Sequence, residues 1–279
     1  MISDTALRLK SIDYRRRILK VIKQAQGGHT GGSLSCVDIL NVLYNSVMNV
    51  GPESFVSPDR DRYVQSKGHS VEALYVVLAD RGFFPQEELE TVSKYKSPFV
   101  GHPTRKVPGI EHNTGALGHG LAFGVGQALA GKIDRRSYRV YALLGDGELA
   151  EGSNWEASMS AAHYALDNLV VIVDRNGLQI SGPTEQVHPL EPLGDKLRAF
   201  GYAVRTVDGN DVSALRSTFG DVPFVKGKPN LVLARTTKGK GVSLMEDSSG
   251  WHHRVPTEDE FAQAMRELDA AERNLKREG

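Results

Sequence analysis

Short apolar runs alternate with longer segments of helical spacing along most of the chain. The runs that read as strands lie at residues 62–66, 138–144, 169–173, 203–207 and 231–235. Apolar residues recur at helical spacing at 5–23, 37–47, 71–79 and 153–164, and further helices are expected between the later strands. Because strands that alternate with helices pair in parallel, the pattern predicts an α/β fold, with a doubly wound, mostly parallel sheet and helices on both faces.

No linker, repeat or shift in composition interrupts this alternation. The sequence therefore predicts one domain over residues 1–279, with a loop-rich middle at about 82–118. The C-terminal tail at about 257–279 reads as an exposed, charged helix. Four glycines in the segment 27–33 are expected to keep it irregular and to let its backbone approach a ligand closely.

Charge and composition narrow the class of partner and the compartment. The 34 Lys and Arg residues balance the 34 Asp and Glu residues, which leaves no net field to attract nucleic acid or an anionic membrane. The apolar runs are far shorter than the roughly 20 residues that cross a bilayer. The single cysteine, Cys36, excludes an internal disulfide, and the N-terminal segment is charged where a signal peptide is apolar. We therefore expect a cytoplasmic protein that binds neither nucleic acid nor membrane.

Candidate chemistry begins where two strand-like runs end. The run 140–144 leads into Gly145-Asp146-Gly147, and the run 169–173 is followed by Asn176, 30 positions after Asp146, and by Leu178. Each motif alone is usually a turn. Together they place a carboxylate, an amide oxygen and a backbone carbonyl at the carboxyl ends of neighbouring parallel strands, where ligands bind in such sheets. These oxygens suit Mg²⁺, Ca²⁺ or Mn²⁺ bound together with a diphosphate.

The stretch from Gly145 to Thr184 resembles the cofactor motif of thiamine-diphosphate enzymes, which opens with Gly-Asp-Gly and closes with an asparagine at the spacing found here. Among these enzymes the chain is most similar to the transketolase family. The likeness continues in QAQGGHTGGSLS, SKGHSVEALY, GHPTRKVPGIEHNTGALGHG and TTKGKGVSLMEDSSGWHH, and so spans nearly the whole chain.

The resemblance implies how the cofactor, thiamine diphosphate, would be bound. Asp146, Asn176 and the Leu178 carbonyl would bind the divalent metal, and the Gly147 amide and His69 would face the diphosphate. Glu151 matches a family glutamate that couples paired active sites across an interface, and a solvated carboxylate at a helix start is the alternative. The remaining expected cofactor contacts are Gly115, Leu117 and His252.

Four histidines are expected to converge in one cleft. His29, His69, His102 and His252 match family residues that point at substrate hydroxyls or cofactor, where an imidazole can donate, accept or carry a proton. These four are the candidate catalytic residues. A lone histidine is more often a surface or structural residue, which is the expectation for His112, His163, His188 and His253. Departures from the commonest family pattern, which leave the sugar open, occur at Asn113, His119 and His253.

The resemblance also implies an activity and a partner. Transketolases move a two-carbon glycolaldehyde unit from a ketose phosphate to an aldose phosphate, with pentose-phosphate sugars as the default substrates, and the cofactor acts as electron sink. The glutamate that touches the cofactor aminopyrimidine lies in a second domain in this family, and only 28 residues follow Trp251 here. We therefore expect a diphosphate-binding subunit that needs a C-terminal transketolase subunit, with the pyrimidine-binding domain, in an α2β2 heterotetramer.

Other functional classes fit the sequence less well. A dinucleotide-binding loop at 118–124 lacks a preceding strand, and the segment 236–241 lacks the P-loop pattern. Deoxyxylulose-phosphate synthases and the α chain of 2-oxo acid dehydrogenases share the metal motif, but the repeated Gly-His segments favour a transketolase over the dehydrogenase chain. A non-catalytic paralogue is the last alternative, and the presence of Asp146, Asn176 and the four histidines argues against it.

Overall fold

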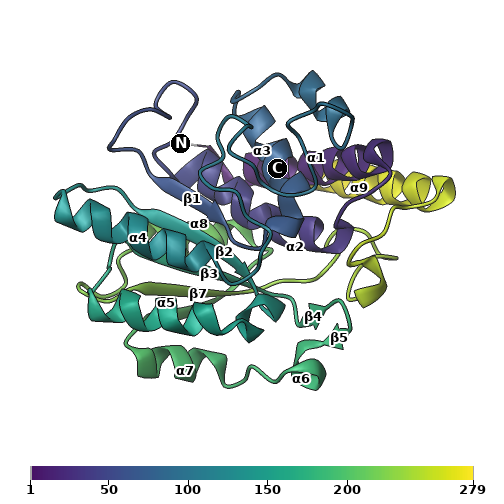
Figure 1. Cartoon of the computed structure of the whole chain (residues 1–279). Helices are drawn as coiled ribbons and strands as arrows, with labels where there is room; N and C mark the ends of the chain where they lie inside the picture. The colour runs from purple at the N-terminus through teal and green to yellow at the C-terminus, as the bar shows by residue number, and fades with distance from the viewer. Residues whose placement is uncertain (1, 279) are drawn as a thin grey trace.

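A five-stranded sheet runs through the centre of the computed structural model, which describes residues 2–278 (Figure 1). All neighbouring strands are parallel, in the order β1-β2-β3-β7-β6. The strands are β1 (Arg62–Gln65), β2 (Val140–Gly145), β3 (Leu169–Arg175), β6 (Ala203–Asp208) and β7 (Asn230–Arg235). The predicted α/β class is confirmed, and β3 continues two residues beyond its predicted end, through Asp174 and Arg175.

Helices cover both faces of the sheet, and each face has its own apolar core (Figure 1). One face is covered by α1 (Asp4–Ala25), α2 (Thr30–Val42), α3 (Val71–Asp80) and α8 (Val212–Gly220), and the other by α4 (Gly120–Ile133), α5 (Gly152–His163) and α7 (Leu193–Phe200). Tyr141 and Leu143 of β2 pack in the first core, whereas Ala142 and Leu144 pack in the second. A strand buried on both faces needs apolar side chains at successive positions, which explains the unbroken apolar runs.

The connections after β1 and β2 leave toward opposite faces of the sheet, to α3 and to α5. Such a change of direction opens a crevice at the carboxyl ends of the strands. The elements around this crevice are short: η2 (Gly68–Ser70) after β1, η4 (Gly147–Ala150) after β2, and the antiparallel pair β4 (Leu178–Gln179) and β5 (Gly182–Pro183) after β3. The predicted metal and cofactor residues therefore lie at the open end of the sheet.

The glycine-rich segment before α2 is more regular than the sequence predicts. Gly31 and Gly32 already belong to the first turn of α2, so the expectation of an irregular backbone was wrong for them. A Cβ atom on Gly31 would lie 2.9 Å from the Trp251 carbonyl oxygen, and one on Gly32 would lie 2.7 Å from the Ser70 hydroxyl oxygen. Close packing against neighbouring segments, rather than a non-helical backbone, explains these two glycines.

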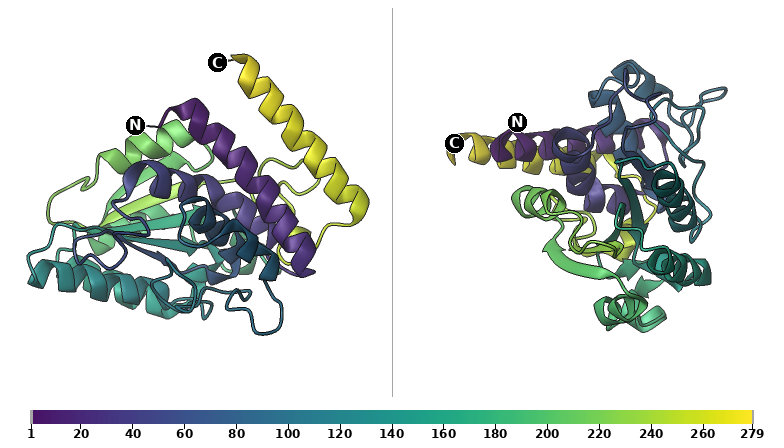
Figure 2. Two further views of the ribbon diagram at one scale, coloured as in Figure 1. Left: turned by 90° about the horizontal axis from the view of Figure 1, so that it is seen from above. Right: turned by 90° about the vertical axis from the view of Figure 1, so that its left-hand side faces the viewer.

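The C-terminal helix α9 (Glu258–Glu278) lies alongside α1 at the edge of the molecule (Figure 2). The predicted helix is present, but it is not exposed throughout, because Ala264 and Leu268 are buried in the core that includes α1. Arg16 of α1 also pairs with Asp269 at 2.8 Å and with Glu272 at 2.5 Å. Apolar contacts and ion pairs together fix this helix on α1.

The remaining elements connect or extend these layers. They are η1 (Leu43–Val47), η3 (Gln86–Thr91), α6 (Thr184–Val187) and η5 (Ser249–Trp251). The predicted loop-rich middle holds only η3 as a described helix before α4 begins. Within residues 2–278, no helix is both long enough and apolar enough to cross a membrane.

Candidate active site

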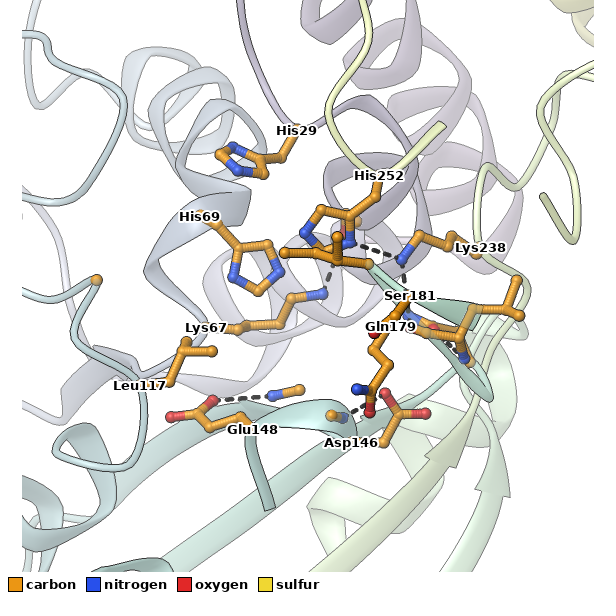
Figure 3. Close-up of a pocket in the computed structure, with 17 residues that line it drawn as sticks. His29, Lys67, His69, Leu117, Asp146, Glu148, Gln179, Ser181, Lys238 and His252 are labelled. Atoms are coloured by element: carbon orange, nitrogen blue, oxygen red, sulfur yellow. Dashed lines mark hydrogen bonds between the residues drawn. The ribbon is translucent and has the colours of Figure 1, made fainter. Parts of the chain in front are cut away.

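A cavity of about 420 Å³ opens at the carboxyl ends of β1, β2 and β3 (Figure 3). Its walls come from the start of α2, from the loops after β1, β2, β3 and β7, and from the loop before α4. The structure brings together in this wall most of the residues selected from the sequence: His29, His69, Gly115, Leu117, Asp146, Gly147, Asn176, Leu178 and His252. His102 and Glu151 lie outside the lining of the cavity.

Asp146 stands directly after β2 and is held by three hydrogen bonds. Its carboxylate accepts from the backbone N–H of Gly147 at 2.8 Å and of Gly177 at 2.6 Å, and from the Arg175 guanidinium at 3.0 Å. Burial raises the pKa of this carboxyl group, while the bonds from Gly177 and Arg175 act in the opposite direction. The bond from Gly177 joins the loops after β2 and β3, and so brings Asp146 beside Asn176.

Asn176 and Leu178 supply the other two oxygens expected at the metal site. The Asn176 amide oxygen accepts from the Leu178 N–H at 3.1 Å, and its nitrogen donates to the Ser35 hydroxyl at 3.2 Å. No group of three His, Cys, Asp or Glu side chains in the described part of the chain could hold a metal. A cation here would depend on the Asp146 carboxylate, the Asn176 amide and the Leu178 carbonyl, which we call the oxygen set. Such a mixed set suits Mg²⁺ that keeps phosphate and water ligands.

Two buried lysines supply positive charge to the cavity (Figure 3). Lys67 pairs with Asp174, and although burial lowers the pKa of Lys67, the Asp174 carboxylate outweighs this and the pKa lies above its ordinary value. Lys238 has no carboxylate partner among the described residues. Its Nζ donates to the Leu178 carbonyl at 3.2 Å and lies 3.0 Å from His252 Nδ1.

The environment of Lys238 fits an anionic ligand. Its side chain is only 2% exposed, and burial together with the charge of Lys67 lowers its pKa to about 8. Buried charges are normally paired with an opposite charge. An anion in the cavity would provide that missing charge, and a diphosphate next to a cation on the oxygen set fits this requirement.

Four histidine rings gather around His29 at one side of the cavity, and we call these four residues and His29 the histidine cluster. The distances from the His29 ring centre are 5.2 Å to His69, 5.9 Å to His102, 5.5 Å to His252 and 4.7 Å to His253. Burial is the main cause that lowers the pKa of His29 to about 3, of His252 to about 4, and of His69 and His102 below the ordinary value. These four rings are therefore neutral near pH 7, and each can both donate and accept.

The loop before α4 is fastened to the sheet by the buried carboxylate of Glu148. This group accepts from the Ser66 hydroxyl, from the Gly118 N–H at 2.9 Å and from the Gly145 N–H at 3.0 Å. The fastening holds Gly115 and Leu117 beside the cavity. Gly115 has φ +134°, and a Cβ atom there would lie 2.7 Å from the His102 ring, so this position requires glycine.

Glu151 does not contact the cavity within this chain. It is the residue before α5, its side chain makes no hydrogen bond to the start of that helix, and it is exposed. Two of the departures from the family pattern have local structural roles: the Asn113 side-chain oxygen accepts from the Arg105 N–H at 2.8 Å, and His119 Nδ1 lies 3.1 Å from the Leu117 carbonyl oxygen. The third, His253, is exposed, as expected for a surface residue, and its ring also packs against His29 in the histidine cluster.

Comparison with known proteins assigns this arrangement to a family. The model of the transketolase thiamine diphosphate binding domain matches residues 8–274. The chain belongs to the transketolase family. It is 47% identical to an apulose-4-phosphate transketolase subunit of Phocaeicola vulgatus, over 98% of this chain and 97% of that protein. It is 40% identical to a 6-deoxy-6-sulfo-D-fructose transketolase subunit of a Clostridium species, over 91% of this chain and 93% of that protein.

Solved transketolase structures share the fold. The transketolase from Leishmania mexicana superposes with a TM-score of 0.83 and 27% identity, over 99% of this chain and 46% of that chain. Human transketolase, at 38% identity, is likewise covered only over 42% of its length. The chain thus spans nearly all of the separate transketolase subunits but less than half of the single-chain transketolases. It corresponds to the N-terminal, thiamine-diphosphate-binding subunit of a split transketolase, which is a transferase.

Several polar residues of this cavity were not predicted from the sequence. Lys67 and Lys238 lie in the SKGHS and TTKGKG segments, immediately after β1 and close after β7, where a charged residue faces the same open end as Asp146. Glu148 follows Asp146 by two positions in η4. Their position after strand ends was the available signal, but burial and pairing, which distinguish them from solvated charges, are properties of the fold.

Proposed function

We propose that this chain binds thiamine diphosphate through a divalent cation and, together with a partner subunit, transfers a two-carbon unit from a ketose phosphate to an aldose phosphate. The observation that carries the proposal is the Lys238 ammonium, buried between the oxygen set and the histidine cluster without a carboxylate partner among the described residues. A metal-bound diphosphate would supply the anion that Lys238 lacks, and its metal ion would be bound by the oxygen set.

The residues of the cavity have separate roles in this proposal. Asp146, Asn176 and the Leu178 carbonyl would bind Mg²⁺, with Ca²⁺ or Mn²⁺ as substitutes. The Lys238 ammonium, the Gly147 amide and His69 would face the diphosphate. The ring end of the cofactor would lie against Gly115, Leu117 and His252.

Thiamine diphosphate, when bound, supplies a nucleophilic carbon and an electron sink for breaking the carbon bond next to a ketose carbonyl. The chain's own contribution would come from neutral imidazoles. His29, His69 and His102 would orient sugar hydroxyls and carry protons between them, because a neutral imidazole offers one donor and one acceptor nitrogen. The donor sugar loses two carbons and the acceptor gains them, so the transfer needs no external oxidant or reductant.

The partner protein would complete the site with the pyrimidine-binding domain, in an α2β2 assembly. Support comes from length: the chain spans 97% of a protein named as a transketolase subunit and only 42% of human transketolase. The exposed Glu151 at the start of α5 would then contribute across an interface rather than within this cavity. A cytoplasmic location agrees with the single cysteine, which is buried and free.

A test of this function starts with the complex of this chain and its partner. The complex would be stripped of metal with a chelator, reloaded with thiamine diphosphate and Mg²⁺, and assayed with apulose 4-phosphate, 6-deoxy-6-sulfofructose, xylulose 5-phosphate and fructose 6-phosphate as donors. Only after reloading do we expect at least one donor to lose two carbons while the acceptor gains them. The acceptor is ribose 5-phosphate when xylulose 5-phosphate is the donor, and glyceraldehyde 3-phosphate with the other donors. Mass spectrometry of both products measures the transfer.

The same assay, repeated with pyruvate in place of the ketose, separates the alternatives. A 2-oxo acid consumed in place of a ketose would indicate a deoxyxylulose-phosphate synthase or a dehydrogenase chain. Cofactor binding without turnover of any substrate would indicate a non-catalytic paralogue. The chain without its partner provides the control, and full activity of this isolated chain would contradict the two-subunit proposal.

A further inference from the structure

His253 borders the approach from solvent to the histidine cluster. Its side chain is exposed, whereas the adjacent His252 lines the cavity. Its ring centre is 4.7 Å from that of His29, closer than the ring of His69, His102 or His252, and the two planes meet edge-on at 70°. A ligand that contacts His29 would therefore be within reach of the His253 ring.

The polar atoms of this cluster largely lack partners within the protein. The buried Nδ1 of His29 has no hydrogen-bond partner within residues 2–278. Across the described residues, histidine ring nitrogens make hydrogen bonds only at His119 and His252. Unsatisfied polar atoms in a partly buried cluster are costly unless a ligand supplies the missing donors and acceptors. A polyhydroxylated chain is a ligand that can do so.

The charged neighbour of His253 is engaged elsewhere. The Arg254 guanidinium lies 4.3 Å from the centre of the Trp251 ring and pairs with Glu260 at 2.5 Å. These contacts engage the Arg254 guanidinium. Of the two exposed neighbours of His252 in this segment, His253 is therefore the one whose side-chain polar atoms make no hydrogen bond with the described residues.

We propose that His253 is a specificity-determining residue, which hydrogen-bonds a hydroxyl of the sugar chain beyond the two carbons that are transferred. This inference rests on the proposed function. Because the His253 side chain is exposed whereas that of His29 is partly buried, the His253 ring would meet the part of the sugar that is farther from the cofactor. That part is present in a five-carbon acceptor and absent from a two-carbon aldehyde, and the effect of His253 would depend on acceptor length.

Three variants of the assembled complex test this role. His253→Phe keeps an aromatic ring against His29 but removes both ring nitrogens, and His253→Gln keeps hydrogen bonding without the ring. His163→Gln, at an exposed position at the end of α5, is the matched control. Each is assayed with saturating fructose 6-phosphate as donor and either ribose 5-phosphate or glycolaldehyde as acceptor.

We expect His253→Phe to raise the KM for ribose 5-phosphate about fivefold, the size expected for one lost hydrogen bond. The KM for glycolaldehyde, kcat and the affinity for thiamine diphosphate should stay unchanged. His253→Gln should restore most of the lost affinity. An equal change with both acceptors, or equal losses in the Phe and Gln variants, would mean that His253 only supports the His29 ring, and would overturn the proposal.

Calorimetry of ribose 5-phosphate binding to the cofactor-loaded complex separates this inference from the proposed function. Weaker binding in His253→Phe, in a complex that transfers no two-carbon unit, would leave the inference standing while the proposed function fails. Equal affinity of wild type and His253→Phe would overturn the inference whether or not transfer occurs. Absence of binding to the wild-type complex would overturn it as well.

Discussion

Asp146 and His29 belong to the same cavity, yet their surroundings differ. The Asp146 carboxylate receives two backbone N–H groups and one guanidinium, whereas the buried Nδ1 of His29 receives no partner from the described residues. Groups fixed by backbone hydrogen bonds keep one geometry, which suits a cation with strict ligand positions. The rings of the histidine cluster contact mainly one another, so they can form hydrogen bonds with hydroxyl groups in different positions. Under the proposed function, the surroundings of Asp146 would form a preorganised cofactor region, and the histidine cluster would form a substrate region that takes its hydrogen bonds from the ligand.

The largest effect should come from removing the Asp146 carboxylate, which three hydrogen bonds hold in place. Asp146→Ala is expected to weaken metal-dependent binding of thiamine diphosphate by at least about 100-fold, because even groups that only support a metal ligand are worth roughly 10- to 100-fold. Arg175 would keep Glu185 and Glu191 as partners, so the fold should persist. Calorimetry of the assembled variant measures the affinity, with Asp195→Asn, an exposed carboxylate, as control. Undiminished affinity would remove Asp146 from the metal site.

Lys238→Met should have the next largest effect, a loss of about 10- to 100-fold in affinity for thiamine diphosphate, which is the range of a charge-assisted hydrogen bond. Because the pKa of Lys238 is lowered to about 8, its positive charge is lost as the pH rises through that value. Wild-type affinity should therefore fall above about pH 8, and the variant should lack this decline. Lys240→Gln, which removes a more exposed ammonium paired with Glu246, is the matched control. Parallel pH profiles of the Met variant and wild type would contradict the assignment.

Glu72 holds the backbone of His29 in place beneath the histidine cluster. Its carboxylate accepts from the backbone N–H of His29 at 3.2 Å and from the Ser33 hydroxyl at 2.8 Å. Burial raises the pKa of Glu72 from 4.5 to about 7. A raised pKa means that the folded state binds the proton more tightly, so stability is present at low pH and is lost as the pH rises from about 4.5 through about 7. The slope is at most about 1.4 kcal/mol per pH unit.

Urea unfolding of wild type and Glu72→Gln between about pH 5 and pH 8 measures this contribution. The variant should show a flatter dependence of the unfolding free energy on pH, and the exposed Glu87→Gln should resemble wild type. Identical slopes in all three proteins would show that Glu72 is not the group that titrates.

The smallest effect on cofactor binding is expected at Glu151. Its side chain is exposed outside the cavity, so Glu151→Gln should change thiamine diphosphate affinity less than about twofold, as for other exposed charges. If it couples two sites across an interface, the variant should instead change how binding at one site affects the other, which a stepwise cofactor titration of the assembled complex records. A large loss of affinity at every site would mean that Glu151 contacts the cofactor from a second copy.

The sequence alone predicted the placement of Asp146 and Asn176 better than that of the histidine cluster. Asp146 and Asn176 follow apolar runs, and the rule that parallel strands present their carboxyl ends together places both at one edge of the sheet. No such rule reaches His253, which is carried by a loop near the end of the chain and meets His29 only through tertiary packing. Only the resemblance to a family indicated that the other four histidines converge.

Two predictions about local structure were wrong in part, because a glycine-rich segment and a charged helix can each have more than one structural cause. Gly31 and Gly32 indicated a loop but serve close packing in α2. The charged face of α9 indicated exposure, although Ala264 and Leu268 carry the contact with the core. In both cases the segment against which these residues pack lies far away in the sequence, so the local pattern alone could not show the contact.

Lys238 has two neighbours, the Leu178 carbonyl and His252, to which the proposed function gives separate roles in binding the metal and the ring end of the cofactor. A cation that takes this carbonyl, together with an anion that draws the ammonium toward itself, would free the His252 nitrogen to receive a new partner. An unloaded enzyme and a loaded enzyme would then present different surfaces to an incoming sugar. The Lys238 side chain would then set the order of binding, with the sugar recognised in full only after thiamine diphosphate is bound. Sugar affinity measured with and without thiamine diphosphate would reveal this order.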